Sequence, residues 1–188
     1  MVGIPFLDHL MTAKEDDSKT KNELLQMNSA TMLHQLVRGT PRERAEAAEN
    51  LAQQGSEAAY AASELTAACG DTEQVRLWAV AALEQLGAPP VSTIDSLVGL
   101  AQSEQPLIAY WAVTLLGRTG PKAKVHQQAI AELLERSNDL AVREKAAWSL
   151  GRMRADSSQT TLALKQAARS PEARLSRVAS KALQQMQR

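Results

Sequence analysis

The chain has 188 residues, equal numbers of basic and acidic side chains, and 44% apolar residues, a composition typical of one globular domain with a hydrophobic core. Only 3% of the residues are aromatic, which favours helices because strands draw on aromatic and β-branched side chains. The balanced charge excludes a molecule attracted as a whole to nucleic acid or membrane, and the single cysteine excludes an internal disulfide.

Residues 1–20 are predicted to form a flexible tail. Within it, the apolar segment 4–11 (IPFLDHLM) precedes the polar stretch 12–21 (TAKEDDSKTK). The apolar segment either folds back onto the domain, docks on a partner, or is incidental. The tail lacks the features of a signal peptide, and no apolar run approaches the length of a membrane span. We therefore expect a cytoplasmic protein.

From residue 40 onward, one amphipathic helical pattern recurs five times. A leucine closes each run, and successive leucines are 32, 33, 34 and 33 residues apart. An alanine lies four residues before every one of them, on the same helical face, where a small side chain lets two helices approach closely. A period near 33 residues is typical of a solenoid. The five leucines are Leu51, Leu83, Leu116, Leu150 and Leu183.

Each unit also contains a second helix, marked by Leu65, Leu97, Ile130 and Leu164 at the same spacing. Gly55, Gly87-Ala-Pro-Pro90 and Gly120-Pro121 separate the first helices from the second ones in three units, and the polar turn 154–158 does so in the fourth. A single domain is expected over residues 21–188. Its expected parts are a capping helix at 21–37, hairpins at about 40–69, 71–102, 105–136 and 139–168, and a terminal helix at 171–187.

Several first helices carry start signals. Thr40-Pro-Arg-Glu43 reads as a capping box with proline at the first helical position, and Ser170-Pro171 repeats the serine and the proline. Asp71, and either Asn138 or Asp139, are expected to cap two further helices.

These units resemble the HEAT-like repeats first described in phycobilisome lyases. The resemblance rests on Asp71, Val75-Arg76, Ala79 and Gly87, and on the similar residues 138–151; it covers about 150 residues. It implies an all-α fold, a right-handed α-solenoid of stacked HEAT-like helical hairpins, with the second helices on the concave side. It also implies that an aspartate before each first helix pairs with an arginine of a neighbouring unit, which would make Arg44, Arg76 and Arg143 structural.

Three enzyme classes with helical repeats are considered. Di-iron hydroxylases need repeated His-Glu pairs, whereas His9, His34 and His126 are followed by leucine or glutamine. Alkylpurine DNA glycosylases need exposed aromatic residues on a basic surface, but Trp78 and Trp111 share one repeat position beside the buried stripe, which favours packing. Phycobilin lyases hold a tetrapyrrole, and no cysteine or histidine cluster suggests one. Cys69 follows an Ala-rich helix and is read as a core residue. We expect no catalytic residue, no cofactor and no metal.

Charge is distributed unevenly along the chain. Residues 1–138 hold 11 basic and 17 acidic side chains, whereas residues 139–188 hold 10 basic and only 4 acidic ones. A basic end suits an acidic protein partner, although it also suits a solvated cap, weak head-to-tail association or a phosphate backbone. The candidate partner-binding residues are Lys145, Arg152, Arg154, Arg174, Arg177 and Lys181.

The sequence thus favours a non-catalytic adaptor or scaffold that binds another protein. An accessory lyase or a chaperone-like maturation factor of the phycobilin-lyase type is the first alternative. Nucleic-acid binding through the basic end is the second. The sequence leaves the oligomeric state open.

Overall fold

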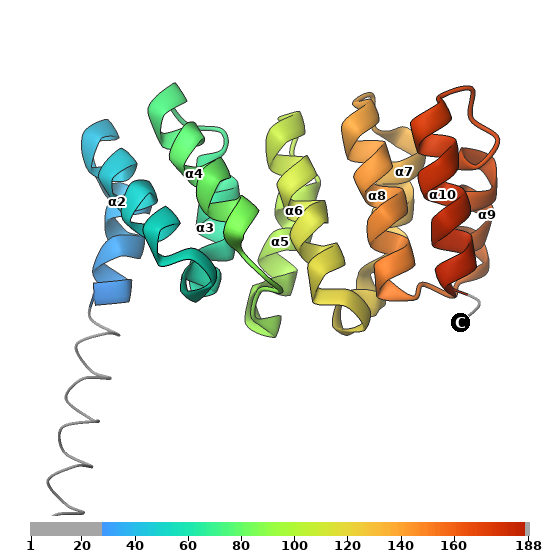
Figure 1. Cartoon of the computed structure of the whole chain (residues 1–188), viewed down its shortest axis with the longest axis horizontal. Helices are drawn as coiled ribbons and strands as arrows, with labels where there is room; N and C mark the ends of the chain where they lie inside the picture. Colours follow the sequence, from blue (N-terminus) through green and yellow to red (C-terminus); the bar gives the residue numbers. More distant parts are fainter. Residues whose placement is uncertain (1–27, 187–188) are drawn as a thin grey trace, which may run out of the picture.

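The computed structural model describes residues 28–186, and this part of the chain consists of helices joined by short turns, without strands (Figure 1). The predicted tail, its segment 4–11 and the start of the predicted capping helix lie outside the described residues. Residues 28–38 are helical, and Leu36 from this helix is buried against the repeats. The first helices of the repeats are α2 (Pro41–Gln54), α4 (Glu73–Gln85), α6 (Pro106–Thr119), α8 (Leu140–Met153) and α10 (Ala173–Met186). The second helices are α3 (Ala62–Ala68), α5 (Ile94–Ala101), α7 (Gln127–Arg136) and α9 (Ser158–Ala167).

Short 3-10 turns lead into three of the second helices, at Gly55–Ala61, Val91–Thr93 and Gly120–His126. Two of these turns begin at a glycine with positive φ, 57° at Gly55 and 67° at Gly120, a conformation that strains other residues. Helix α8 is instead capped at its carboxyl end by Arg154, a non-glycine residue with φ of 52°. The breakers seen in the sequence therefore lie where the chain reverses direction.

Two of the expected caps form and two do not. The Thr40 hydroxyl accepts the Glu43 N–H while the Glu43 carboxylate accepts the Thr40 N–H, and Asp139 accepts the Val142 N–H. The prediction for Asp71 was wrong, because its carboxylate is held by Arg44 and by the adjacent Thr72 N–H. The prediction for Ser170-Pro171 was also wrong. Helix α10 begins at Ala173, so the proline lies in the turn before it.

The repeat positions form the core. All five alanines that precede the leucines have an exposed fraction of 0%. The four second-helix positions, Leu65, Leu97, Ile130 and Leu164, are likewise fully buried. Burying these side chains stabilises the fold by roughly 1.5–3 kcal/mol for each large one. The buried alanines are Ala47, Ala79, Ala112, Ala146 and Ala179.

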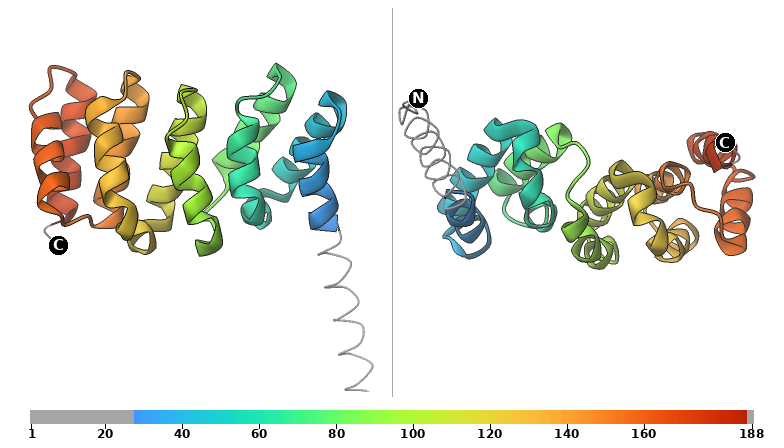
Figure 2. Two further views of the ribbon diagram at one scale, coloured as in Figure 1. Left: turned by 180° about the vertical axis from the view of Figure 1, so that it is seen from behind. Right: turned by 90° about the horizontal axis from the view of Figure 1, so that it is seen from below.

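The helices form two layers, with the first helices side by side and the second helices behind them (Figures 1 and 2). Each second helix packs on the next first helix, as α3 does on α4 and α7 does on α8. Glycines allow the closest approaches within the first layer. Gly151 of α8 faces the backbone of Ala182 in α10, and Gly117 of α6 faces the ring of Trp148 in α8. A side chain at either position would push the two helices apart.

The first layer is interrupted between α4 and α6. Helices α2 and α4, α6 and α8, and α8 and α10 pack closely, whereas α4 and α6 do not (Figure 1). The residue after the repeat leucine is Ala52 in α2, Gly117 in α6 and Gly151 in α8, but the exposed Glu84 in α4. A long charged side chain at this position disfavours the close approach that glycine permits.

Polar contacts bridge this interruption. The half-buried guanidinium of Arg118, from α6, donates to the carbonyl oxygens of Leu83 (2.6 Å) and Leu86 at the carboxyl end of α4. These carbonyls have no partner within their own helix, so the contact satisfies them. The same guanidinium lies 5.7 Å from the ring centroid of Trp111. Helix α3 completes the junction by packing on both α4 and α6.

Of the arginine–aspartate ion pairs expected between neighbouring repeats, one forms among the described residues. Arg44 of α2 binds both carboxylate oxygens of Asp71 at 2.6 and 2.8 Å, and it also donates to the Gly39 carbonyl. Arg143 donates to the Leu134 carbonyl instead, and Arg76 makes no ion pair in the described part of the chain. Arg44 and Arg143 are therefore structural, through different partners.

Gly151→Ala should destabilise the protein. The added methyl would lie 2.8 Å from the Ala182 Cα and 2.9 Å from its Cβ. This crowding outweighs the better helix propensity of alanine, so the free energy of unfolding should fall by about 1 kcal/mol in urea titrations. Gly99→Ala is the matched control, because nothing lies within 4 Å of the added atom, and it should raise stability by about 0.5–1 kcal/mol. Equal effects would contradict close packing at Gly151.

Asp71→Asn should lower the urea midpoint at pH 7, with a smaller effect in acid. Arg44 holds the pKa of Asp71 below its usual value in the folded state. The pair therefore stabilises the fold above the unfolded pKa of about 3.9, and this contribution is lost as the pH falls through the lower folded pKa. The difference from wild type should shrink at about pH 3. Asp95→Asn, at a side chain that is 93% exposed, should have little effect at pH 7.

Candidate interaction surfaces

The six basic residues singled out in the sequence lie together on two adjacent first helices, α8 and α10, with Arg154 at the end of α8. We call this set the basic surface. Because α8 and α10 pack closely through Gly151, the two rows of cations are held in a fixed relation. The basic surface consists of Lys145, Arg152, Arg154, Arg174, Arg177 and Lys181.

Two members of the basic surface are engaged within the molecule. The ammonium group of Lys145 lies 5.1 Å from the ring centroid of Tyr110 and 5.0 Å from that of Trp148, so it contributes to the packing of α6 on α8. Arg174 lies 2.9 Å from the carboxylate of Glu144, whose side chain is only 11% exposed. Glu144 is therefore nearly buried, and Arg174 supplies the positive charge that compensates its carboxylate.

The other four members are exposed and have no acidic partner among residues 28–186. Arg152 and Arg154 line a small hollow of about 170 Å³ with Gln185. Arg177 and Lys181 lie four residues apart, so they share one face of α10. Arg177 contacts only the backbone of its own helix, at the Ala173 carbonyl. These four side chains can meet an external anion without breaking an internal ion pair.

In the structure, the acidic and the basic residues lie mainly in different halves of the solenoid. Residues 28–104 carry four arginines and ten acidic residues, whereas residues 105–186 carry thirteen basic and six acidic ones. The change of sign falls between α5 and α6, next to the interrupted packing of the first layer. The molecule therefore has an acidic half and a basic half, although its total charge is zero.

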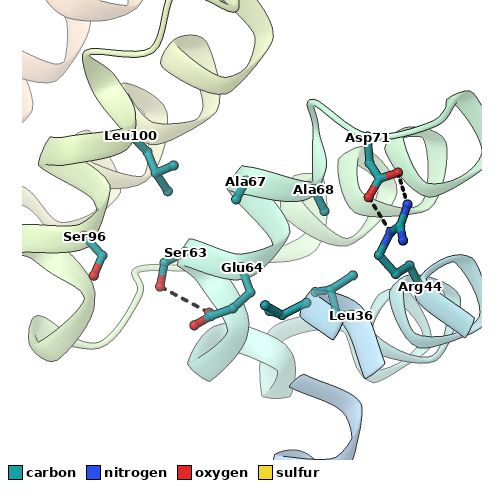
Figure 3. A pocket seen from close by; sticks show the side chains of 10 residues that line it. Leu36, Arg44, Ser63, Glu64, Ala67, Ala68, Asp71, Ser96 and Leu100 are labelled. Atoms are coloured by element: carbon teal, nitrogen blue, oxygen red, sulfur yellow. Dashed lines mark hydrogen bonds and ion pairs between the residues drawn. The ribbon is translucent and has the colours of Figure 1, made fainter. Parts of the chain in front are cut away.

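A groove in the acidic half was not predicted from the sequence. It has a volume of about 540 Å³ and lies between the helix at 28–38, α3 and α5 (Figure 3). Its lining residues come from separate parts of the chain, so no local sequence motif predicts the groove. Glu64 and Ala67 of α3, Leu100 of α5 and Val37 are among its lining residues. The Arg44–Asp71 pair lies at one end (Figure 3).

Groups that could support other chemistry are scattered. No cluster of three or more metal-ligating side chains occurs in the described part of the chain. Cys69 is buried, and burial raises the pKa of its thiol to about 12, which keeps it protonated. His126 lies 3.3 Å from Asp95, His34 is exposed, and His9 lies outside the described residues.

The aromatic residues pack rather than gather into a binding platform. Trp111 is 7% exposed and meets Tyr110 edge to face at 5.6 Å. Trp78 and Trp148 are half-buried against the core and against Gly117, respectively. These positions agree with the packing role expected from their place in the repeat. Among the described helices, none is long and apolar enough to span a membrane.

Comparison with known proteins finds similarity to helical-repeat proteins. Residues 94–184 match the family model described as HEAT repeats. No curated protein is similar to this chain. An engineered protein of known crystal structure is 17% identical, with a TM-score of 0.59 over 84% of this chain and 80% of that one. A designed armadillo repeat protein in complex with the peptide (KR)4 is 16% identical, with a TM-score of 0.59 over 88% of this chain and 84% of that one.

At these identities the solved structures establish the fold alone. They agree with the two-layered stack of helical hairpins described above, and the family model matches the carboxyl-terminal part of that stack. The chain is therefore an α-solenoid, and its residues 94–184 match the model of HEAT repeats.

Proposed function

We propose that this protein is a non-catalytic scaffold that binds an acidic region of another protein through the basic surface. The observation that carries the proposal is the set of four exposed cations on α8 and α10 without an internal acidic partner: Arg152, Arg154, Arg177 and Lys181. HEAT and armadillo repeats commonly mediate protein interactions, and the designed armadillo relative is in complex with a peptide.

The mechanism follows from the rigidity of the packed helices. Helices α8 and α10 hold their cations at fixed positions, so a partner loses little freedom on the side of the scaffold. Arginine forks can bind carboxylate groups through two parallel hydrogen bonds, which gives direction as well as attraction. Binding therefore needs no cofactor and no moving part.

An acidic protein fits this charge pattern better than a long nucleic acid does. A duplex that extends beyond the basic surface would meet the acidic half of the solenoid, whose carboxylates repel phosphate groups. A short acidic segment of a protein can bind α8 and α10 without reaching that half. The proposed compartment is the cytoplasm.

The finer resemblance to phycobilisome-lyase-type repeats rests on the sequence pattern at Asp71, Val75-Arg76 and residues 138–151. It supports an accessory lyase or a chaperone-like maturation factor as the alternative proposal. This alternative is tested by incubating the protein with a linear tetrapyrrole and recording visible absorbance. A stable bound pigment would favour it over the scaffold.

Reversing three cations of the basic surface should abolish partner binding. The variant carries Arg152→Glu, Arg177→Glu and Lys181→Glu, and it leaves Lys145 and Arg174 in their internal contacts. Nuclease-treated lysate is passed over immobilised wild type and variant, and bound proteins are identified by mass spectrometry. A protein retained by wild type should be lost from the variant, and its direct affinity should fall at least about tenfold.

The matched control reverses Lys122, Lys165 and Arg169, which are exposed elsewhere and change the total charge equally. This control should keep the partner. Equal loss from both variants would mean that only total charge matters, which contradicts a defined surface. Steeply salt-dependent binding to duplex DNA, removed by the first variant alone, would replace the protein partner with nucleic acid.

A further inference from the structure

The groove at the acidic half contains one carboxylate that lacks a cation. Three charged residues line it, and two of them, Arg44 and Asp71, bind each other. The third, Glu64, is half-buried and accepts a hydrogen bond from the Ser63 hydroxyl at 3.2 Å. No basic side chain among the described residues pairs with Glu64. The groove therefore presents an uncompensated negative charge.

The rest of the lining is apolar or small. Val37 is 53% exposed, Leu100 is half-buried, and both line the same hollow as Glu64. Ala67 on α3 and Ser96 on α5 are exposed small residues, so they leave room for a chain to approach both helices. The volume of about 540 Å³ lies within the range of about 300–1,000 Å³ that is typical of binding pockets.

We propose that this groove binds a short extended peptide of a partner protein that carries an aliphatic side chain beside a lysine or arginine. The aliphatic side chain packs against Val37 and Leu100. The cation pairs with Glu64, whose partly buried position strengthens the attraction. The surrounding acidic half adds a field of the same sign and attracts a basic peptide during its approach.

Charge argues against the alternative occupant, the protein's own apolar segment 4–11. Residues 1–27 contain five acidic and three basic side chains, and segment 4–11 itself contains Asp8 and no lysine or arginine. If this segment lay in the groove, it would add negative charge near the carboxylate of Glu64. A basic partner would instead neutralise that carboxylate. The groove thus differs from the basic surface in charge, in location and in the partner it suits, and it stands independently of the proposed function.

The test selects ligands without assuming their sequence. A randomised library of peptides about twelve residues long, displayed on phage, is panned against the full-length protein. Selected peptides should be enriched in lysine or arginine next to leucine, isoleucine, valine or methionine. A synthetic, fluorescein-labelled copy of the most enriched peptide is then titrated with wild type and variants, and binding is followed by fluorescence anisotropy.

Glu64→Lys should weaken binding at least about tenfold, because it replaces attraction by repulsion. Ala67→Arg should do the same by filling the groove with a cationic side chain. Glu57→Lys is the matched control: it makes the same charge change at an exposed residue that does not line the groove, and it should leave the affinity within about twofold. Circular dichroism melts verify that all three variants fold.

Three results would overturn the proposal. One is a selection that enriches no peptides or acidic ones. Another is that Glu57→Lys and Glu64→Lys weaken peptide binding equally. The attraction would then come from the overall negative charge of the acidic half and not from Glu64. The third is tighter peptide binding after Phe6→Asp and Leu7→Asp, which would show that the protein's own segment fills the groove. Because Arg152, Arg177 and Lys181 are untouched here, failure of this site leaves the test of the basic surface unaffected.

Discussion

The architecture depends on the close approach of successive first helices. A fully buried alanine recurs in each of them, and Gly117 and Gly151 let α6, α8 and α10 come nearly into backbone contact. Such contacts leave little free volume, so one methyl group in the wrong place shifts whole helices. They also keep the exposed residues of neighbouring helices in register. The surfaces proposed here as binding sites exist because this packing orders the side chains above it.

The same constraint explains where the solenoid is irregular. Glu84 occupies the position that glycine holds in α6 and α8, and the packing between α4 and α6 is replaced by the polar contacts of Arg118. Hydrogen bonds to helix-terminal carbonyls are directional but cover less surface than interlocked side chains. The match to HEAT repeats begins at residue 94, the first residue of α5, which lies in sequence between the two helices of this junction.

Charge is divided between an acidic half and a basic half of the solenoid. The acidic half presents a groove with an unpaired Glu64, and the basic half presents Arg152, Arg177 and Lys181 on a closely packed pair of helices. A molecule with zero total charge can thus attract two partners of opposite sign at separate places. In a packed stack of helices the two proposed sites are held apart at a fixed distance.

The sequence by itself determined the period, the hairpins and the buried positions, because helical amphipathicity and turn residues are local properties. It also located the basic residues on α8 and α10. Only the tertiary structure decided which cations are free, since Lys145 lies against two rings and Arg174 against Glu144. It alone revealed the groove, whose walls are brought together from three helices. It also decided that Asp71 binds Arg44 rather than capping α4, because a bidentate ion pair competes with a single capping hydrogen bond for the same carboxylate.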